Sequence, residues 1–102
     1  MNNYIVEVLE RAVRDMSEIY EYIRKDKESA AIKVYNEIEK AIENLCAFPF
    51  KGALVDKDDR SMNGYRYVMV RPYLIFYKIN GKKITVYHVI DGKRDYLNIL
   101  EN

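Results

Sequence analysis

The residues that could do chemistry are concentrated between Tyr65 and Tyr96. The basic residues of this segment, with its C-terminal tyrosine, are Arg66, Arg71, Lys78, Lys82, Lys83, His88, Lys93, Arg94 and Tyr96. Arginine can bind a phosphate through two N–H donors and stays charged at any relevant pH. His88 has the only side chain here whose ordinary pKa lies near neutrality, so it and Tyr96 are the candidates for acid or base. We take Arg71, Lys83 and Lys93 as candidate binding residues, and expect the function to lie on this segment.

Positive charge is concentrated in the same segment. From Tyr65 to Arg94 the only acid is Asp91. Residues 1–50 carry 7 basic and 10 acidic side chains, whereas residues 51–102 carry 10 basic and 6 acidic ones. A protein with a net charge of only +1 can still bind a polyanion through one basic face. An ordinary solvated surface explains the same pattern, so charge alone does not assign a nucleic-acid partner.

Each candidate also has a purely structural interpretation. Arg66 and Arg71 could be strand residues with solvated head groups. Arg94 could form a local ion pair with Asp95 or mark the start of a helix. His88 could be a hydrogen-bonded, half-buried histidine, and Tyr96 could serve in packing or in contact with a partner. The sequence therefore supplies candidates for a site without deciding that a site exists.

The composition limits the class of protein. A chain of 102 residues forms one small domain, residues 1–102, with room for one core. The single histidine has no cysteine or carboxylate cluster at ligand spacing, so we predict no metal and no cofactor. Cys46 cannot form an intramolecular disulfide and is expected to be a small buried thiol, which fits a reducing cytoplasm. The N-terminus lacks the pattern of a signal peptide, and no apolar run is long enough to span a membrane.

The basic segment is predicted to form antiparallel strands. Residues 65–90 are rich in β-branched and aromatic side chains, interrupted at Arg71-Pro72 and at Asn80-Gly81. An Asn-Gly pair between apolar runs is a strong hairpin signal, because both central turn residues need positive φ. In the last strand, simple alternation puts His88 on one face with Ile84, Val86 and Ile90. Both faces of this sheet are apolar.

Two amphipathic helices are expected before the sheet. Apolar spacing predicts one from Glu10 to about Lys25, and a second with Ser29 as N-cap that ends near Cys46. They should form an antiparallel hairpin that covers one face of the sheet. The further expectations are an edge strand over residues 4–9, an exposed mobile loop over residues 53–63, and a short helix over residues 93–100 with Leu97 and Leu100 pointing inward. The fold class is therefore α+β, in the order β-α-α-β-β-β(-α), and the second sheet face is left partly open or covered by a partner.

With these elements in this order, the chain resembles the RelE/ParE superfamily, the toxins of type II toxin–antitoxin (plasmid stabilisation) modules. The resemblance covers nearly the whole chain and rests on the order and spacing of its pieces. These pieces are YIVEV at the start, Ala12, Asp15, Ile19 and Tyr22-Ile23, then Ala31, Ile38, Ile42 and Leu45, FPFKG at 48–52, GYRY at 64–67, YLIFYKI at 73–79 and GKRDY at 92–96. The resemblance implies a small cytoplasmic toxin, neutralised by a cognate antitoxin that lays an extended segment and a helix over it.

The resemblance implies two alternative mechanisms. RelE-type members cleave messenger RNA on the ribosome, which needs a base, an acid and cations around the phosphate. ParE-type members inhibit DNA gyrase without cutting RNA. If this chain is RelE-like, its catalytic residues would be Arg66, Arg94, His88 and Tyr96.

The catalytic residues usual in RelE-type nucleases are not all present at the matching positions of this chain. RelE-type enzymes usually have an arginine where this chain has Tyr73-Leu74, and a basic strand where it has Tyr67 and Met69. Their acid or base near the C-terminus falls at Leu100, which cannot do that chemistry. We therefore favour ParE-like gyrase inhibition, with the metal-independent ribonuclease as the alternative and an inactive member retained for partner binding as the third reading. In each case we expect no membrane partner and no small-molecule substrate.

Overall fold

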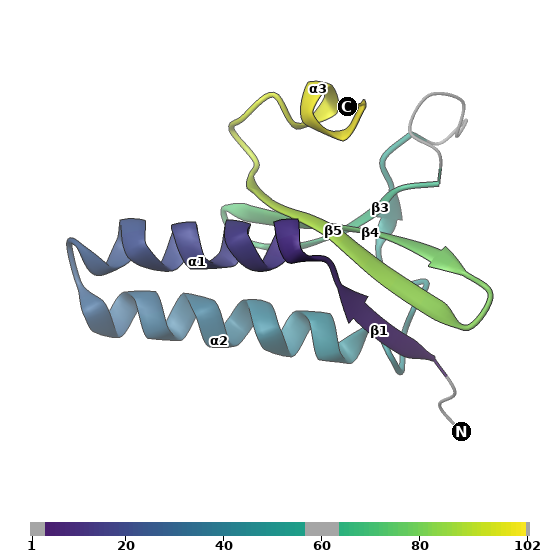
Figure 1. Cartoon of the computed structure of the whole chain (residues 1–102), viewed down its shortest axis with the longest axis horizontal. Coiled ribbons are helices and arrows are strands. Elements are labelled where there is room, and N and C mark those ends of the chain that lie inside the picture. The colour runs from purple at the N-terminus through teal and green to yellow at the C-terminus, as the bar shows by residue number, and fades with distance from the viewer. Residues whose placement is uncertain (1–3, 57–63, 102) are drawn as a thin grey trace.

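A pair of long helices lies along one face of a five-stranded sheet in the computed structural model, which describes residues 4–56 and 64–101 (Figure 1). The elements are β1 (Ile5–Val8), α1 (Glu10–Arg24), α2 (Glu28–Asn44), β2 (Ala53–Leu54), β3 (Arg66–Val70), β4 (Tyr73–Asn80), β5 (Lys83–Asp91) and α3 (Tyr96–Glu101). The predicted α+β fold and element order are confirmed, with β2 as an addition. None of the helices in the described residues is long and apolar enough to cross a membrane.

The sheet has the strand order β1-β5-β4-β3-β2. All neighbouring strands are antiparallel except β1 and β5, which run parallel with Ile5 opposite Lys83 and Val8 opposite Val86. Gly81 has a φ of 59° in the turn between β4 and β5, which is the conformation that the Asn-Gly pair predicts. The first strand therefore lies at an edge of the sheet, as expected, beside the last strand of the chain.

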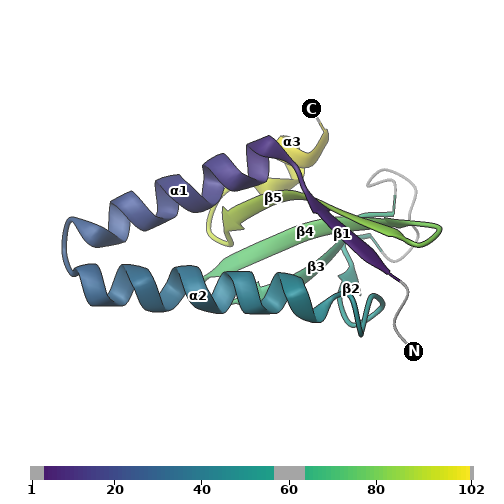
Figure 2. The same ribbon diagram turned by 60° about the horizontal axis from the view of Figure 1, so that its bottom comes forward.

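The helical hairpin forms the main core with one sheet face (Figure 2). Helix α1 contributes Ala12 and Met16, and α2 contributes Ile38 and Ile42, because apolar residues three or four positions apart share a helix face. The buried residues that complete this cluster are Leu45, Tyr73, Ile75, Tyr77, Ile84, Val86 and Val89. Full burial of a side chain such as Ile38 contributes on the order of 1.5–3 kcal/mol. The hairpin is thus fixed to the sheet by a continuous apolar layer.

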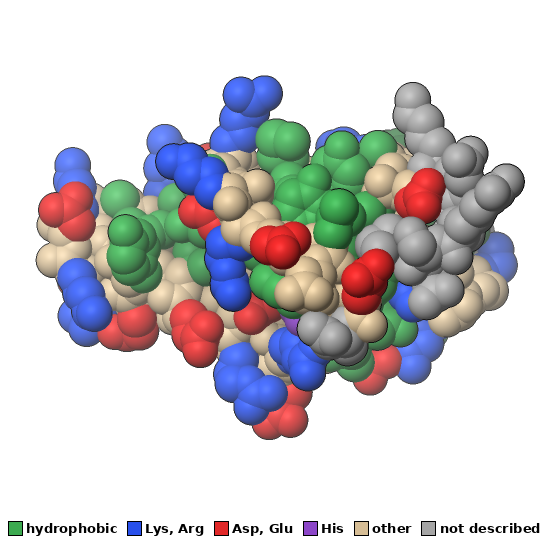
Figure 3. Space-filling model, turned by 90° about the horizontal axis from the view of Figure 1, so that it is seen from above, with side chains coloured by type: hydrophobic (Ala, Val, Ile, Leu, Met, Phe, Trp, Pro, Cys, Tyr) green, Lys and Arg blue, Asp and Glu red, His purple; other side chains and the backbone are tan. Residues whose placement is uncertain are grey.

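The opposite sheet face is partly covered by the chain itself. Helix α3 lies over this face (Figure 1) and packs Leu100 against Leu74, Phe76 and Ile90. Figure 3 looks onto this side, where hydrophobic side chains gather in the middle and lysine and arginine side chains stand mostly around them. Leu100 is 8% exposed, as its predicted inward position requires, but Leu97 is 47% exposed, so that part of the prediction is wrong.

Two local predictions about element ends are also wrong. Helix α2 begins at Glu28, so Ser29 lies inside the helix, and the residue before the helix, Lys27, makes no side-chain capping hydrogen bond. Ala53 pairs with Tyr67 as part of β2 instead of belonging to an exposed loop. The remainder of that expected loop, residues 57–63, lies outside the described residues.

A β-bulge in β5 changes the face assigned to His88. Phe76 is opposite His88 while Tyr77 is opposite Val86, so Tyr87 is an extra residue in the ladder. Ile84 and Val86 pack with the helical hairpin, whereas Ile90 packs with Phe76 on the α3 side. Cross-strand partners share a face, which places His88 with Phe76 and Ile90. The alternation expected from the sequence is therefore wrong beyond the bulge.

Candidate partner-binding surfaces

His88 lies in a buried contact between β5 and α1. Its side chain is only 7% exposed, with Nδ1 3.6 Å from Asp15 Oδ2 and Nε2 3.5 Å from Arg11 Nη1. A guanidinium can only donate, so Nε2 is the accepting nitrogen and the ring proton faces Asp15. Burial lowers the pKa of His88, although the nearby Asp15 carboxylate opposes the shift. The neutral ring held between two side chains fits the structural alternative better than a solvent-facing acid or base.

Asp15 closes the edge of β5 where β1 has ended. Its Oδ2 accepts a hydrogen bond of 3.0 Å from the backbone N–H of Val89. Burial raises the pKa of Asp15, and the Val89 N–H and His88 oppose that shift by favouring the carboxylate. An edge-strand N–H that would otherwise lack a strand partner is satisfied in this way. Asp15 and His88 together therefore position α1 on the sheet.

Arg66 supports a turn between α2 and β2. Its Nη1 donates a hydrogen bond of 2.8 Å to the carbonyl oxygen of Gly52, and its guanidinium lies 5.1 Å from the ring centre of Phe50. The buried hydroxyl of Tyr77 accepts from the Gly52 N–H at 2.9 Å and donates to the Pro49 carbonyl at 2.8 Å. A Cβ on Gly52 would clash with the Tyr77 hydroxyl oxygen. The Arg66 guanidinium is thus used to stabilise the turn that contains Phe50 and Gly52.

Arg94 lines a groove of about 310 Å³ between α1 and the end of β5. The same groove is lined by three carboxylates, those of Asp15, Glu18 and Asp91. Negative charges at such a site repel a phosphate group and weaken any phosphate contact that Arg94 could make. The structure therefore places the most family-like of the predicted arginines beside three carboxylates that disfavour anion binding.

Arg71 and Tyr96 line a common groove on the other sheet face. This groove has a volume of about 430 Å³, and its wall includes Tyr67 and Met69. The ring centre of Tyr96 lies 5.3 Å from that of Phe76, so Tyr96 has a packing role on this face. Among the predicted site residues, only these two are brought together in one groove of the described residues.

The predicted binding lysines lie apart from that groove. Lys83 Nζ forms an ion pair of 2.7 Å with Glu7 Oε1, and both side chains are about half exposed. Lys93 is exposed in the turn after β5, where its backbone N–H donates a 2.9 Å hydrogen bond to Asp91 Oδ1. The cations and acids of the hypothetical nuclease are therefore distributed over several surfaces. No group of three His, Cys, Asp or Glu side chains suited to a metal ion occurs within residues 4–56 and 64–101.

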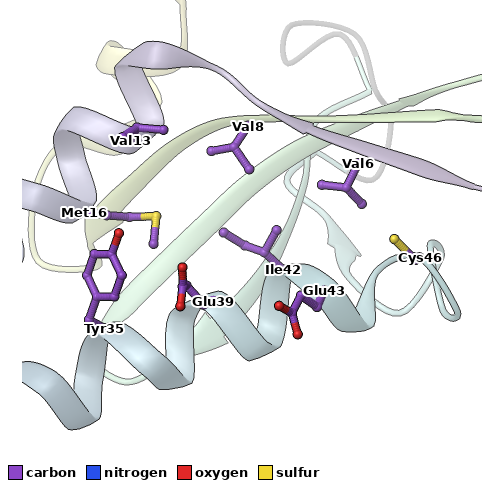
Figure 4. Close-up of a pocket in the computed structure, with 9 residues that line it drawn as sticks. All are labelled: Val6, Val8, Val13, Met16, Tyr35, Glu39, Ile42, Glu43 and Cys46. Atoms are coloured by element: carbon purple, nitrogen blue, oxygen red, sulfur yellow. The ribbon is translucent and has the colours of Figure 1, made fainter.

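A groove that the sequence analysis did not predict lies between β1 and the helical hairpin (Figure 4). Its volume is about 380 Å³, and we call it the β1 groove. It is lined by Val6, Val8, Val13, Met16, Tyr35, Glu39, Ile42, Glu43 and Cys46. Apolar side chains form most of its wall, with the two glutamates beside them (Figure 4). An alternation of Val6 and Val8 was visible in the sequence, but it could not show that α2 leaves these side chains partly uncovered.

The edge of β1 borders this groove. The N–H groups of Ile5 and Leu9 donate to Lys82 and Val86, so the odd-numbered residues of β1 face β5. Val6 and Val8 therefore direct their N–H and C=O groups away from β5, toward the side on which the described sheet has no further strand. An apolar groove next to an unpaired strand edge is the arrangement that binds an extended peptide by strand addition.

Comparison with known proteins identifies the family. Residues 6–96 match the family model described as the ParE toxin of the type II toxin–antitoxin system parDE. The chain belongs to the ParE toxin family. It is also 29% identical over 85 residues to Toxin ParE3 of Caulobacter vibrioides, a match that covers 83% of this chain and 76% of that protein.

A solved structure shares the ParE fold. It belongs to a work titled Chromosomal ParDE TA system from P. aeruginosa, and the superposition has a TM-score of 0.72. The match covers 87% of this chain and 96% of that one at 18% sequence identity, so it supports the fold. The family assignment itself makes the chain a toxin of a type II toxin–antitoxin module, whose partner class is an antitoxin.

Proposed function

We propose that this ParE-family chain arrests growth by binding and inhibiting DNA gyrase, and that it does not cut RNA. The observation that carries the proposal is the dispersal of the candidate catalytic residues. Arg66 supports a turn, His88 is buried against α1, and Arg94 shares a groove with three carboxylates. General acid–base catalysis needs its groups within hydrogen-bond reach of one reacting centre. The ParE name of the matching family and of the curated relative supports the same choice.

The target can be tested by inducing the protein in a bacterial host. Plasmid supercoiling, bulk protein synthesis and messenger RNA ends would be followed together after induction. Our proposal predicts a change in supercoiling while messages stay intact. Early arrest of protein synthesis with cut messenger RNA would instead support the RelE-like ribonuclease. Normal growth would support an inactive family member that is retained for partner binding. Both candidate targets are cytoplasmic, so we place the protein in the cytoplasm under this proposal.

Two conservative variants sharpen the choice between mechanisms. Tyr96→Phe removes only a hydroxyl and keeps the ring that packs on Phe76, and Arg94→Gln removes a charge from an exposed side chain. A nuclease that uses these groups would lose about 10²–10⁴-fold in activity on removal of Tyr96 as acid or base, and about 10²–10³-fold on removal of Arg94 as the cation that stabilises the phosphate charge. If gyrase inhibition is the mechanism, both variants should still arrest growth, because neither change removes a group that inhibition needs for catalysis. Relief by both variants, with stable protein, would contradict the proposal.

We also propose that the antitoxin inserts an extended apolar segment into the β1 groove and adds a strand to β1. The apolar walls would hold its side chains, and the outward N–H and C=O groups of Val6 and Val8 would pair with its backbone. Val13 is a suitable position for a test, because it lines the groove and is 46% exposed. Val13→Lys would place a charge in the groove without burying it in the core.

The exposed Ile32 on α2 provides a matched control. It is 47% exposed and does not line the β1 groove, so Ile32→Lys makes the same chemical change elsewhere. Titration with the purified antitoxin should give at least tenfold weaker binding for Val13→Lys, about 1.4 kcal/mol, and little change for Ile32→Lys. Equal affinities for both variants would show that the antitoxin uses a different surface.

A further inference from the structure

The two carboxylates of the β1 groove lie on one face of α2. Glu39 and Glu43 are four positions apart, so they project from the same side of the helix, about 6 Å apart along its axis. Both side chains line the groove, and both are exposed (Figure 4). Tyr35 lies one turn closer to the start of α2 and extends the same row. The α2 side of the groove is therefore acidic, whereas β1 and α1 contribute its apolar side chains.

Within the part of the chain that the structure describes, neither carboxylate is paired with a cation. None of the ion pairs within residues 4–56 and 64–101 involves Glu39 or Glu43. The described residues that line the groove include no Lys, Arg or His. Like charges four positions apart repel each other and slightly destabilise a helix, so helix stability does not explain the pair. Both carboxylates are therefore available to a cation from outside the chain.

A strand added to β1 would bring side chains to this acidic row. Successive side chains of a strand point to opposite faces of the sheet, so every second residue of the added strand would face the helical hairpin. Val6 and Val8 pack on the hairpin side of β1, next to the positions that these residues would take. The hairpin-facing side chains of the added strand would thus lie between the valines of β1 and the glutamates of α2.

The chemistry of the groove defines its occupant. Apolar side chains suit the walls from β1 and α1, whereas a carboxylate that a partner buries without a counter-charge is costly. The ring of Tyr35 adds a second attraction for a cation, and it is positioned by Tyr20, whose ring centre lies 6.0 Å away. A second copy of this chain fits less well, because antiparallel pairing of two β1 edges would bring the glutamates of both copies to the same sheet face.

We infer that the antitoxin segment in the β1 groove carries a basic side chain that forms ion pairs with Glu39 and Glu43, among apolar side chains that face the hairpin. This inference rests on the proposed binding of the antitoxin in the β1 groove, and it adds the charge that the segment must carry. The two glutamates select among antitoxins, since they repel a segment that has an acidic residue at the same position.

Charge reversal on α2 tests the inference by titration with the purified antitoxin. Glu39→Lys replaces an attraction by a repulsion, so its affinity should fall at least about tenfold. Glu37→Lys makes the same change in charge at an exposed position of α2 that does not line the groove, and it should change the affinity little. The difference between the two variants should narrow in about 1 M salt, where the screening length is about 3 Å.

A compensating change in the antitoxin gives a result that misfolding cannot imitate. Each Lys and Arg of the antitoxin would be changed to Glu in turn. One of these variants should bind the Glu39→Lys/Glu43→Lys toxin more tightly than the unchanged antitoxin does. The inference is overturned if none of them restores binding, or if Glu39→Lys and Glu37→Lys bind the unchanged antitoxin equally well.

The Val13→Lys variant distinguishes failure of this inference from failure of the groove as a binding site. Weak binding by Val13→Lys together with unchanged binding by Glu39→Lys would refute the basic side chain and leave the groove as the antitoxin site. Unchanged binding by both variants would refute the groove and the inference together.

Discussion

Removal of the Tyr77 hydroxyl should destabilise the protein more than any other change of one oxygen atom described above. Tyr77 is fully buried, and its hydroxyl joins the Gly52 N–H to the Pro49 carbonyl across the turn that follows α2. Tyr77→Phe keeps the ring in the core and deletes both hydrogen bonds. The two backbone groups are left in a buried site without their partner.

The expected magnitude follows from these two groups. A buried donor or acceptor that loses its partner costs about 1–3 kcal/mol. Because two such groups are affected, and because the turn can relax toward solvent, we expect a loss of about 2–4 kcal/mol in the free energy of unfolding. For a domain of this size that corresponds to a decrease of roughly 10–20 °C in the melting temperature.

Urea denaturation followed by circular dichroism would measure this loss. Tyr22→Phe is the matched control, since its side chain is 75% exposed and the change should cost less than about 0.5 kcal/mol. Gly52→Ala should also destabilise, because the added Cβ would lie 2.7 Å from the Tyr67 carbonyl oxygen as well as against Tyr77. The double variant with Tyr77→Phe should cost less than the sum of the two, since both disrupt one contact. A loss below about 1 kcal/mol for Tyr77→Phe would refute the role given to the hydroxyl.

Three further outcomes are expected. The pKa of His88 in the folded protein lies below its unfolded value of 6.5, so the unfolded state binds more protons there. The free energy of unfolding should therefore fall as pH decreases through 6.5. His88→Gln should remove this dependence on pH, as measured by denaturation at a series of pH values. The pKa of Asp15 is raised in the folded state, so its effect on stability has the opposite sign: stability falls as pH rises above the unfolded pKa of 3.8. Asp15→Ala leaves the Val89 N–H without its partner and should cost about 1–3 kcal/mol in the free energy of unfolding at neutral pH, by the same measurement. Leu100→Ala should cost about 2–5 kcal/mol in the free energy of unfolding. The exposed Leu97→Ala should cost less than about 0.5 kcal/mol, and equal costs would show that α3 is not packed as described.

The overall fold was readable from the sequence because its signals are local. The apolar spacing in α1 and α2 and the Asn80-Gly81 turn each specify an element without reference to the rest of the chain. Since consecutive helices joined by a short turn must pack together, the position of the hairpin on the sheet followed from those elements. The exposed position of Leu97 was missed because α3 uses Ile99 and Leu100 for packing, which depends on how the helix approaches the sheet.

The site predictions failed where tertiary contacts decide. The bulge at Tyr87 moves His88 to the other sheet face, and no turn residue marks it in the sequence. Arg66 was a reasonable phosphate ligand from the sequence, but the structure places it against Gly52 and Phe50. The β1 groove depends on the distance between α2 and an edge strand, which local patterns do not encode.

The most direct test of the central claim is a supercoiling assay with purified gyrase, run beside a ribosome-dependent messenger RNA cleavage assay. We predict that the purified toxin inhibits gyrase, that its Tyr96→Phe variant does so equally well, and that messenger RNA remains intact on ribosomes. Intact gyrase activity together with cut messenger RNA, abolished by Tyr96→Phe, would contradict the account and establish a nuclease.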